Sequence, residues 1–269
     1  MSRALLHLGF HKTGTTSMQG FLRRNHGVLR RHAAILLPQQ TSELARWVWH
    51  LHMLDDDKVK QVIAEDIAGL LAGLDLSGRD LIVSNENLLG PMPQANGRDP
   101  YPHAPALLHL WCEALRALPQ PLRPTLLLTT RSTQDWAVSI HAHLARKPSA
   151  VRLAEDRDSF VARLAAHGTD TTLTTLARAL PDLDIRLHDM ADLATAPHGL
   201  AQPFMDFLHL SAAEQASLQP VGHENRAPAP EVTDRLVALN RSDLGDEALA
   251  DAKRALLREA SLADRECAR

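Results

Sequence analysis

The sequence predicts an α/β fold with three layers and a central, mostly parallel sheet of about five strands. Short apolar runs alternate along the chain with segments of helical periodicity, which is the order expected of βαβ units. The run TLLLTT at 125–130 is continuously apolar and β-branched, as a parallel strand covered on both faces is. Polar segments follow these runs directly, at the strand ends where open parallel sheets bind ligands.

Residues that form turns bound the first three predicted strands. The strands are expected at 4–10, 32–38, 81–86, 125–130 and 184–190. A Gly-containing loop ends the first strand, Pro38 ends the second, and Gly78 and Asp80 precede the third.

Helical periodicity fills the intervals between the strands. It begins at Thr15, and Arg23 and Arg24 supply positive charge to the last turn of this first helix. Further helices are predicted at 41–54, 57–74, 104–118, 132–147 and 158–180, with a break near 168. The remainder is predicted to be helical apart from a Pro-rich loop at 219–230. The four tryptophans lie in helical patterns and are predicted to be core residues.

Composition favours an ordinary globular protein. The chain has 269 residues, of which 45% are apolar and 23% are charged, so it can bury a substantial core and is expected to form one domain over 1–269. Its 29 basic and 32 acidic residues nearly balance, which argues against a nucleic-acid partner.

Targeting signals and metal motifs are not apparent. No stretch approaches the roughly 20 apolar residues that span a bilayer, and the first apolar run leads into polar sequence rather than a cleavage site. The two cysteines, Cys112 and Cys267, cannot build a disulfide framework or a zinc site. We therefore expect a cytoplasmic protein with no membrane span and no bound metal.

The segment GFHKTGTTS at 9–17 has the properties of an anion-binding loop. It follows the first predicted strand and opens the first helix, so its N–H groups lie at the positive end of that helix. Gly9 and Gly14 permit tight backbone geometry. Lys12 adds a full charge, and Thr15, Thr16 and Ser17 add hydroxyl donors. A plain turn with a helix cap is the simpler alternative.

A nucleotide kinase is the natural rival interpretation of this loop. The Walker pattern G-x-x-x-x-G-K-[ST] places Lys directly after the second Gly. In this chain Lys12 precedes Gly14, so the pattern does not match. Asp189, after the fifth predicted strand, is the one carboxylate that the sequence offers as a rival metal ligand.

Two motifs together resemble the sulfotransferases that use 3′-phosphoadenosine-5′-phosphosulfate (PAPS). The first family motif reads K-[TS]-G-T-T, and residues 12–16 match it in full. The second begins with Arg at the end of a core strand and has Ser eight residues later, as Arg131 and Ser139 do. The resemblance covers about the first half of the chain and implies a P-loop-like nucleotide-binding architecture.

The chain departs from the cytosolic small-molecule branch of that family. Ser17 stands where this branch often has Trp, and Thr133 stands where it often has Pro. The C-terminal R-K-G-x-x-G motif of that branch is missing. The sequence KTGTTS is therefore closer to the bacterial and carbohydrate-type branches, and the adenine contacts cannot be transferred.

The resemblance implies that different residues bind the two ends of PAPS. The loop from Lys12 through Thr13, Gly14, Thr15 and Thr16 to Ser17 would hold the 5′-phosphosulfate, and Lys12 would stabilise charge on the departing phosphate. Arg131 and Ser139 would bind the 3′-phosphate, since Arg offers a planar fork to phosphate oxygens. A surface ion pair with Asp135 is the alternative for Arg131.

A second, weaker set of phosphate ligands lies late in the chain. Asn225 and Arg226 belong to the Pro-rich segment 222–230, which is expected to close on the cofactor.

Sulfuryl transfer also needs a base for the proton of the acceptor. Glu86 is favoured, because it stands at the end of the third predicted strand and should face the same crevice as the loop. A turn cap or a pair with an Arg is the alternative for Glu86. His11, next to Lys12, is the second choice, and His103 is the third. For both histidines the simpler expectation is a solvated or core ring.

The long irregular loop at 89–105 is a candidate wall for the acceptor, with Arg98, Tyr101 and His103 as its ligands. His11 and Glu86 would complete this acceptor site.

These expectations describe a PAPS-dependent sulfotransferase that sulfates a hydroxyl of a carbohydrate-like or small-molecule alcohol. A P-loop nucleoside or small-molecule kinase and a non-catalytic nucleotide-binding protein are the alternatives.

Overall fold

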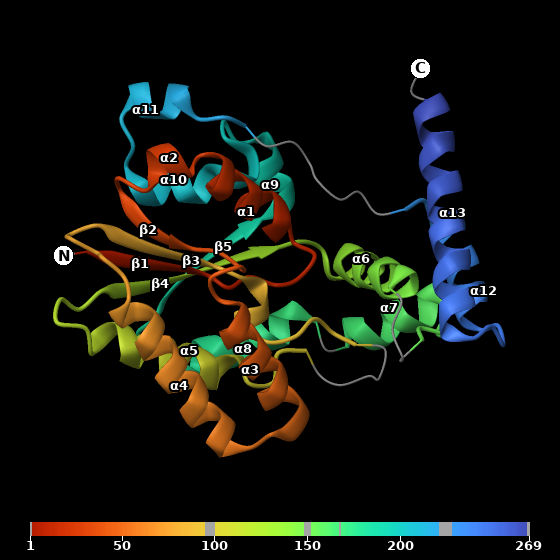
Figure 1. Ribbon diagram of the computed structural model, residues 1–269, viewed down its shortest axis with the longest axis horizontal. Coiled ribbons are helices and arrows are strands. Elements are labelled where there is room, and N and C mark those ends of the chain that lie inside the picture. The colour runs from red at the N-terminus through yellow and green to blue at the C-terminus, as the bar shows by residue number, and fades with distance from the viewer. Residues whose placement is uncertain (1, 95–99, 148–151, 167, 221–227, 268–269) are drawn as a thin grey trace. The chain divides into compact units, whose positions relative to one another are not determined.

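The computed structural model describes residues 2–94, 100–147, 152–166, 168–220 and 228–267 (Figure 1), with the backbone alone for 263–267. Three predicted ligands, Arg98, Asn225 and Arg226, lie outside the described residues.

Five parallel strands form the central sheet, which confirms the predicted α/β class. The strands are β1 (Arg3–His7), β2 (Ala33–Leu36), β3 (Asp80–Ser84), β4 (Arg123–Thr130) and β5 (Asp184–Asp189). Their order is β2-β3-β1-β4-β5, and every neighbouring pair is parallel. Each strand overlaps its predicted run.

The chain divides into two compact units, which are described separately. The first comprises residues 1–92, 100–131 and 169–224, and the second comprises 93–99, 132–168 and 225–269. A single domain over 1–269 stays a prediction.

Helices cover both faces of the sheet in the first unit (Figure 1). One face carries α1 (Thr15–Arg24), α2 (His26–Leu29), α9 (Met190–Thr195), η2 (Gly199–Ala201), α10 (Gln202–Leu208) and α11 (Ala212–Ser217). The other carries α3 (Ser42–Leu54), α4 (Asp57–Ala72), α5 (Ala104–Arg116) and α8 (Thr169–Ala179). A short 3-10 turn, η1 (Glu86–Leu88), follows β3. The predicted three layers are present.

The second unit is helical within its described residues. It contains α6 (Thr133–Arg146), α7 (Arg157–Ala165), α12 (Pro230–Asn240) and α13 (Asp246–Cys267). α6 packs against α7 and α12, and α12 packs against α13. The amide of Asn240 donates to the carbonyls of Ala145, at 3.1 Å, and Leu153, at 3.0 Å, which ties the end of α12 to its neighbours.

The core of the first unit follows from the alternation of side chains along its strands. Leu5, Ile82 and Leu127 come from three neighbouring strands and lie in one buried cluster with Phe21 of α1 and Phe204 of α10. Because this cluster holds α1 against the sheet, it also fixes the position of the loop that precedes α1.

Two of the four tryptophans contradict the prediction that all are core residues, since Trp47 is half-buried and Trp49 is exposed. Trp111 and Trp136 are buried, but the side chain of Trp49 is 41% exposed. Leu44, Val48 and Leu51 form the buried face of α3. Trp49 follows Val48 directly, so the helix turns it about 100° away from that face.

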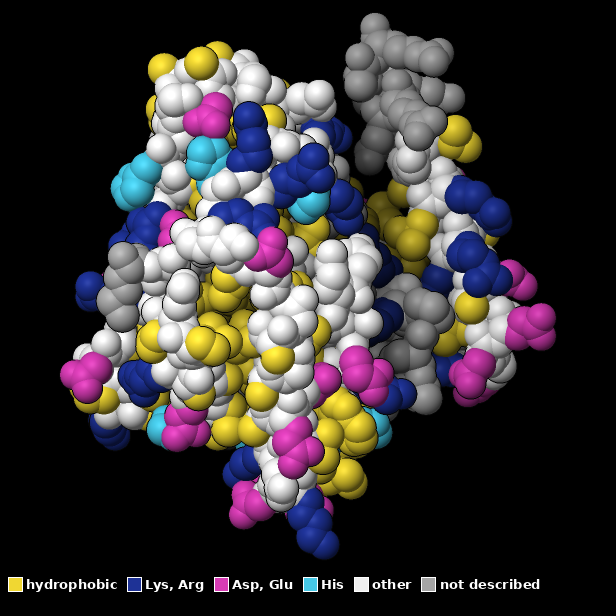
Figure 2. Space-filling model, turned by 60° about the vertical axis from the view of Figure 1, so that its left-hand side comes forward, with side chains coloured by type: hydrophobic (Ala, Val, Ile, Leu, Met, Phe, Trp, Pro, Cys, Tyr) yellow, Lys and Arg dark blue, Asp and Glu magenta, His cyan; other side chains and the backbone are white. Residues whose placement is uncertain are grey.

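The surface carries both signs of charge. Figure 2 shows Lys and Arg next to Asp and Glu on the face it draws. None of the helices within the described stretches combines the length and the apolar character that crossing a membrane requires.

The strand order determines where a ligand can reach the sheet. β1 is the central strand, with β3 on one side and β4 on the other. In open parallel sheets the crevice lies where successive connections leave in opposite directions, beyond the carboxyl ends of the strands. The loop after β1 occupies this position, and the segments after β3 and β4 flank it.

We expect burial to control the stability of the sheet, and one register pair tests this. Leu128 of β4 is fully buried, while its partner Leu187 on the edge strand β5 is 50% exposed. Leu128→Ala should lower the free energy of unfolding by about 2–5 kcal/mol, because it leaves a cavity. The matched Leu187→Ala should change it by less than about 1 kcal/mol. Urea denaturation of both variants measures the difference, and equal losses would contradict the arrangement.

Candidate functional site

Backbone geometry makes the loop between β1 and α1 a tight turn. Lys12 has φ 65° and Gly14 has φ 90°, both in the left-handed region. Gly14 is the N-cap of α1, and a Cβ there would lie 2.9 Å from Cδ1 of Leu200. A side chain at this position would therefore be strained and would also collide with η2, so glycine is required.

A pair of threonines fastens the loop to the sheet. The hydroxyl of Thr13 donates to the carbonyl of Phe10 at 2.5 Å and lies 2.8 Å from the hydroxyl of Thr129 on β4. Since the proton of Thr13 is used on Phe10, the hydroxyl of Thr129 is the donor between the two threonines. Thr13 is fully buried. Its side chain holds the loop, which leaves its N–H as the group that can meet an anion.

The first turn of α1 is electrostatically suited to an anion. No side chain caps this turn and no acidic residue lies in it. Helix N-termini carry partial positive charge and N–H groups that need acceptors. Lys12 is half-buried beside the turn, Thr15 and Ser17 are buried, and Thr16 is exposed. The predicted loop residues are therefore together at one helix end.

Arg131 lies at the same edge of the sheet as the loop. It follows β4 directly, two residues after Thr129, which contacts Thr13. Its guanidinium is half-buried and makes no ion pair among the described residues. Asp135, the alternative partner, instead accepts a hydrogen bond from Ser132. Ser139 lies on α6 in the second unit, so its pairing with Arg131 stays a prediction.

Glu86 lies immediately beyond β3 and is held by a residue that sequence reasoning missed. Gln19 of α1 donates from Nε2 to Oε2 of Glu86 at 2.7 Å. Glu86 is half-buried, and Gln19 is buried. The available signal was a polar residue on the face of α1 that otherwise buries Thr15, Met18 and Leu22. An amide at such a position needs a partner inside the fold.

His11 is enclosed by a network from two other segments. Its N–H donates to the hydroxyl of Tyr101 at 2.9 Å, and its Nδ1 lies 3.0 Å from the same oxygen. Its Nε2 lies 3.2 Å from Oδ1 of Asn87. The phenol proton can then point only to Nδ1, so a neutral ring carries its own proton on Nε2 and donates it to Asn87. In this tautomer neither nitrogen is a vacant base.

Tyr101 and His103, the described residues of the predicted acceptor wall, are buried and half-buried respectively. Tyr101 is 2% exposed, and burial raises the pKa of its phenol, so the hydroxyl keeps its proton. His103 lies 3.8 Å from Asp55, beside the ring of His52. Burial lowers the pKa of His103, against the opposing charge of Asp55. Their assignment to an acceptor site stays a prediction.

His7 is a buried histidine beneath the loop that the sequence did not single out. Its Nδ1 lies 2.7 Å from the hydroxyl of Ser84, and its Nε2 has no hydrogen-bond partner among the described residues. Burial lowers the pKa of His7 to about 4, although the charge of Glu86 opposes the shift. The ring is therefore neutral at pH 7.

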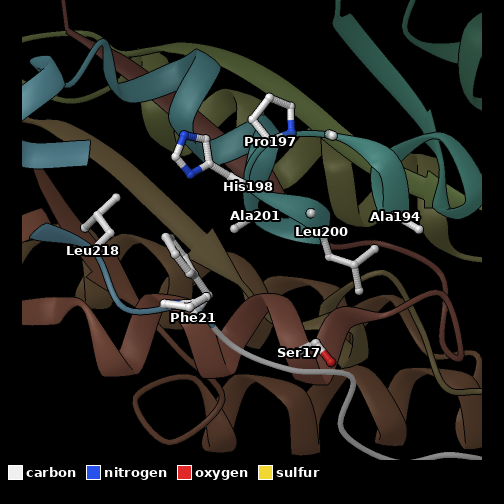
Figure 3. A pocket seen from close by; sticks show the side chains of 11 residues that line it. Ser17, Phe21, Ala194, Pro197, His198, Leu200, Ala201 and Leu218 are labelled. Carbon is white, nitrogen blue, oxygen red and sulfur yellow. The ribbon is translucent and has the colours of Figure 1, made fainter. Parts of the chain in front are cut away.

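A pocket of about 410 Å3 lies between α1 and the segment 194–201. Figure 3 shows Ser17 and Phe21 facing it from α1, with Pro197, His198 and Leu200 on the opposite side. Because Ser17 belongs to the first turn of α1, the pocket adjoins that turn.

The described part of the chain contains no group of three or more His, Cys, Asp or Glu side chains that could hold a metal ion. Asp189, the rival metal ligand, caps α9 by accepting the N–H of Ala191 at 2.7 Å.

The buried neutral state of His7 predicts a pH-dependent stability. The folded pKa of His7, about 4, lies below its ordinary value of 6.5, so the unfolded chain binds the proton more tightly. Stability is therefore lost as pH falls from about 6.5 to 4. The loss from this group should be on the order of 3 kcal/mol. His7→Leu should flatten this part of the profile in urea denaturation.

The control is Ser84→Ala, which removes the hydrogen-bond partner of His7 but keeps the titrating ring. It should lower stability at every pH and retain the slope. A His7→Leu protein with the wild-type slope would show that another group causes the acid loss.

Comparison with known proteins gives no match, since neither a family model, a curated protein nor a solved structure is significantly similar to this chain.

Proposed function

We propose that this protein is a sulfotransferase that moves the sulfuryl group of PAPS to a hydroxyl acceptor. The observation that carries the proposal is the hydrogen bond between Thr13 and Thr129. It joins the K-T-G-T-T loop to the end of β4, so that Lys12 and Arg131 belong to one edge of the sheet. Two cationic segments at one edge fit a ligand with phosphates at both ends.

The residues present fit such a ligand in three respects. The uncapped first turn of α1 and Lys12 offer charge and donors for a phosphosulfate. Arg131 offers a guanidinium with no competing carboxylate among the described residues. The pocket beside Ser17, at about 410 Å3, lies within the size range of small-molecule sites and could take the nucleoside.

PAPS, when bound, supplies an activated sulfuryl group, and the protein positions and neutralises the reacting groups. Glu86 accepts the proton as the acceptor oxygen bonds to sulfur and the bond between sulfur and the phosphate oxygen breaks. Lys12 stabilises the negative charge that remains on the departing phosphate. Oε1 of Glu86 accepts no hydrogen bond among the described residues, so it is the oxygen available for the proton.

The acceptor is proposed to be a carbohydrate-like or small-molecule alcohol, and the protein is proposed to be cytoplasmic. The ring of His11 accepts a hydrogen bond from Tyr101 and donates one to Asn87, which favours Glu86 over His11 as the base. A nucleoside kinase is the second candidate, and the order of Lys12 and Gly14 is the feature that separates the two.

We expect the wild-type protein to bind PAPS and its desulfated product, 3′,5′-adenosine bisphosphate, more tightly than ATP with Mg2+, as measured by calorimetry.

Lys12→Ala should lower kcat/KM for transfer by at least about 100-fold, because the charge that stabilises the departing phosphate is lost. Lys58→Ala, which removes an exposed lysine of α4, is the matched control and should keep wild-type transfer. Preference for ATP with Mg2+ would replace this proposal by the kinase.

Arg131→Ala should weaken binding of 3′,5′-adenosine bisphosphate by at least about 10-fold, the loss expected for a charge-assisted hydrogen bond. Binding of adenosine 5′-phosphate, which lacks the 3′-phosphate, should be unchanged. Arg123→Ala removes an exposed arginine at the opposite end of β4 and should affect neither ligand. Equal weakening of both nucleotides by Arg131→Ala would refute the assignment of Arg131.

A further inference from the structure

The contact between Gln19 and Glu86 links the two halves of the proposed reaction. Gln19 is on α1, the helix whose first turn would bind the sulfuryl donor, and Glu86 is the proposed base on the acceptor side. The two side chains come from segments 67 residues apart and meet at 2.7 Å. Within the described residues, no other side-chain hydrogen bond or ion pair holds the carboxylate of Glu86.

The orientation of the Gln19 amide is determined by its neighbours. Nε2 faces Oε2 of Glu86 and also the carbonyl of Ser84, at 3.5 Å. Both neighbours are acceptors, so only the NH2 end of the amide can face them. Because Gln19 is 8% exposed, water cannot readily replace either acceptor. The amide therefore holds one oxygen of Glu86 in place and leaves the other open.

The backbone beneath Glu86 is fixed independently of Gln19. Asn85 caps η1 by accepting the N–H of Asn87 at 3.0 Å, and its amide donates to the hydroxyl of Thr41 at 2.9 Å. The backbone N–H of Asn85 donates to the carbonyl of His7 at 3.2 Å. Loss of the Gln19 amide should thus free the carboxylate of Glu86 without releasing the turn that carries it.

From these contacts we propose that Gln19 is a positioning residue that holds the Glu86 carboxylate at a fixed place relative to the donor-binding turn. This inference rests on the proposed sulfotransferase function and adds a residue to it. Misplacing a reacting group by about 1 Å can lower the rate about 100-fold, so even a modest release of Glu86 should be measurable. Gln19 acts through Glu86 and touches neither donor nor acceptor.

The test uses Gln19→Met, which keeps the length of the side chain but removes the amide, and Gln19→Asn, which keeps the amide but shortens its reach. Transfer is measured with PAPS and a panel of monosaccharides, p-nitrophenol and a primary alcohol, with water as the default acceptor. We expect kcat to fall by at least about 10-fold in both variants, with the KM for PAPS changed less than about 3-fold. Having two variants keeps the test decisive if one fails to fold.

The matched control is Gln61→Met. Gln61 donates to Glu65 at 3.0 Å on the exposed surface of α4, so this substitution removes the same type of bond away from the sheet edge. It should leave kcat and KM at the wild-type values. A loss of activity in this control as large as that in Gln19→Met would show a general effect of removing such a bond, and would overturn the inference.

A double-mutant cycle separates positioning from structural support. If Gln19 acts through Glu86, Gln19→Met should have no further effect on kcat in the Glu86→Gln background. Additive losses would show that Gln19 acts elsewhere and would overturn the inference, as would a wild-type kcat in both Gln19 variants.

Binding of 3′,5′-adenosine bisphosphate to the wild-type protein distinguishes failure of the inference from failure of the function. Transfer by the wild type with unaffected Gln19 variants would overturn only the role of Gln19. A wild type that binds the nucleotide but transfers sulfate to no acceptor, water included, would overturn the catalytic roles of both Glu86 and Gln19. Absence of binding and of transfer would overturn the proposed function as a whole.

Discussion

The hydrogen bond between the hydroxyls of Thr13 and Thr129 is the contact on which the candidate site depends. Both threonines are fully buried, and a buried hydroxyl without a hydrogen-bond partner is costly. Separating the loop from the end of β4 would therefore either expose both hydroxyls or leave them without partners. This contact closes the turn in which Lys12 has a left-handed backbone. In the same turn Gly14 lies so close to Leu200 that a Cβ would collide with it. The helix end, the lysine and Arg131 are thereby brought to one edge of the sheet by packing rather than by a ligand.

Local sequence patterns were sufficient to predict most of the fold. Five apolar runs separated by helical periodicity predicted the five parallel strands. The central strands β1, β3 and β4 are buried along most of their length, which gives their runs a continuous apolar character. The edge strand β5 is partly exposed, and its run is correspondingly less apolar. The loop was predictable for the same local reason, since glycine, lysine and hydroxyl residues stand in one turn. Trp49 shows the limit of this reasoning, because a helical pattern alone does not decide which side of α3 faces the core.

Residues that meet only in the folded chain could not be found in this way. Gln19, Asn87, Thr129 and His7 are unremarkable in the sequence, and their roles come from partners between 76 and 116 residues away or, for Gln19, from β3 and the turn after it. Tyr101 was selected as part of an irregular loop, yet its hydroxyl is used inside the fold on His11. Burial lowers the pKa of His7, so its ring is neutral at pH 7 and places no positive charge in the core.

Gly90 and Tyr101 flank the segment 91–100. Gly90 has φ 139°, and a Cβ there would lie 3.3 Å from the ring of Tyr101, so the two ends of the segment are pressed together. Closing a loop costs little extra free energy as its length increases. Insertions and deletions between these two anchors should therefore cost the scaffold little stability, so the length of this segment can change without disturbing the sheet.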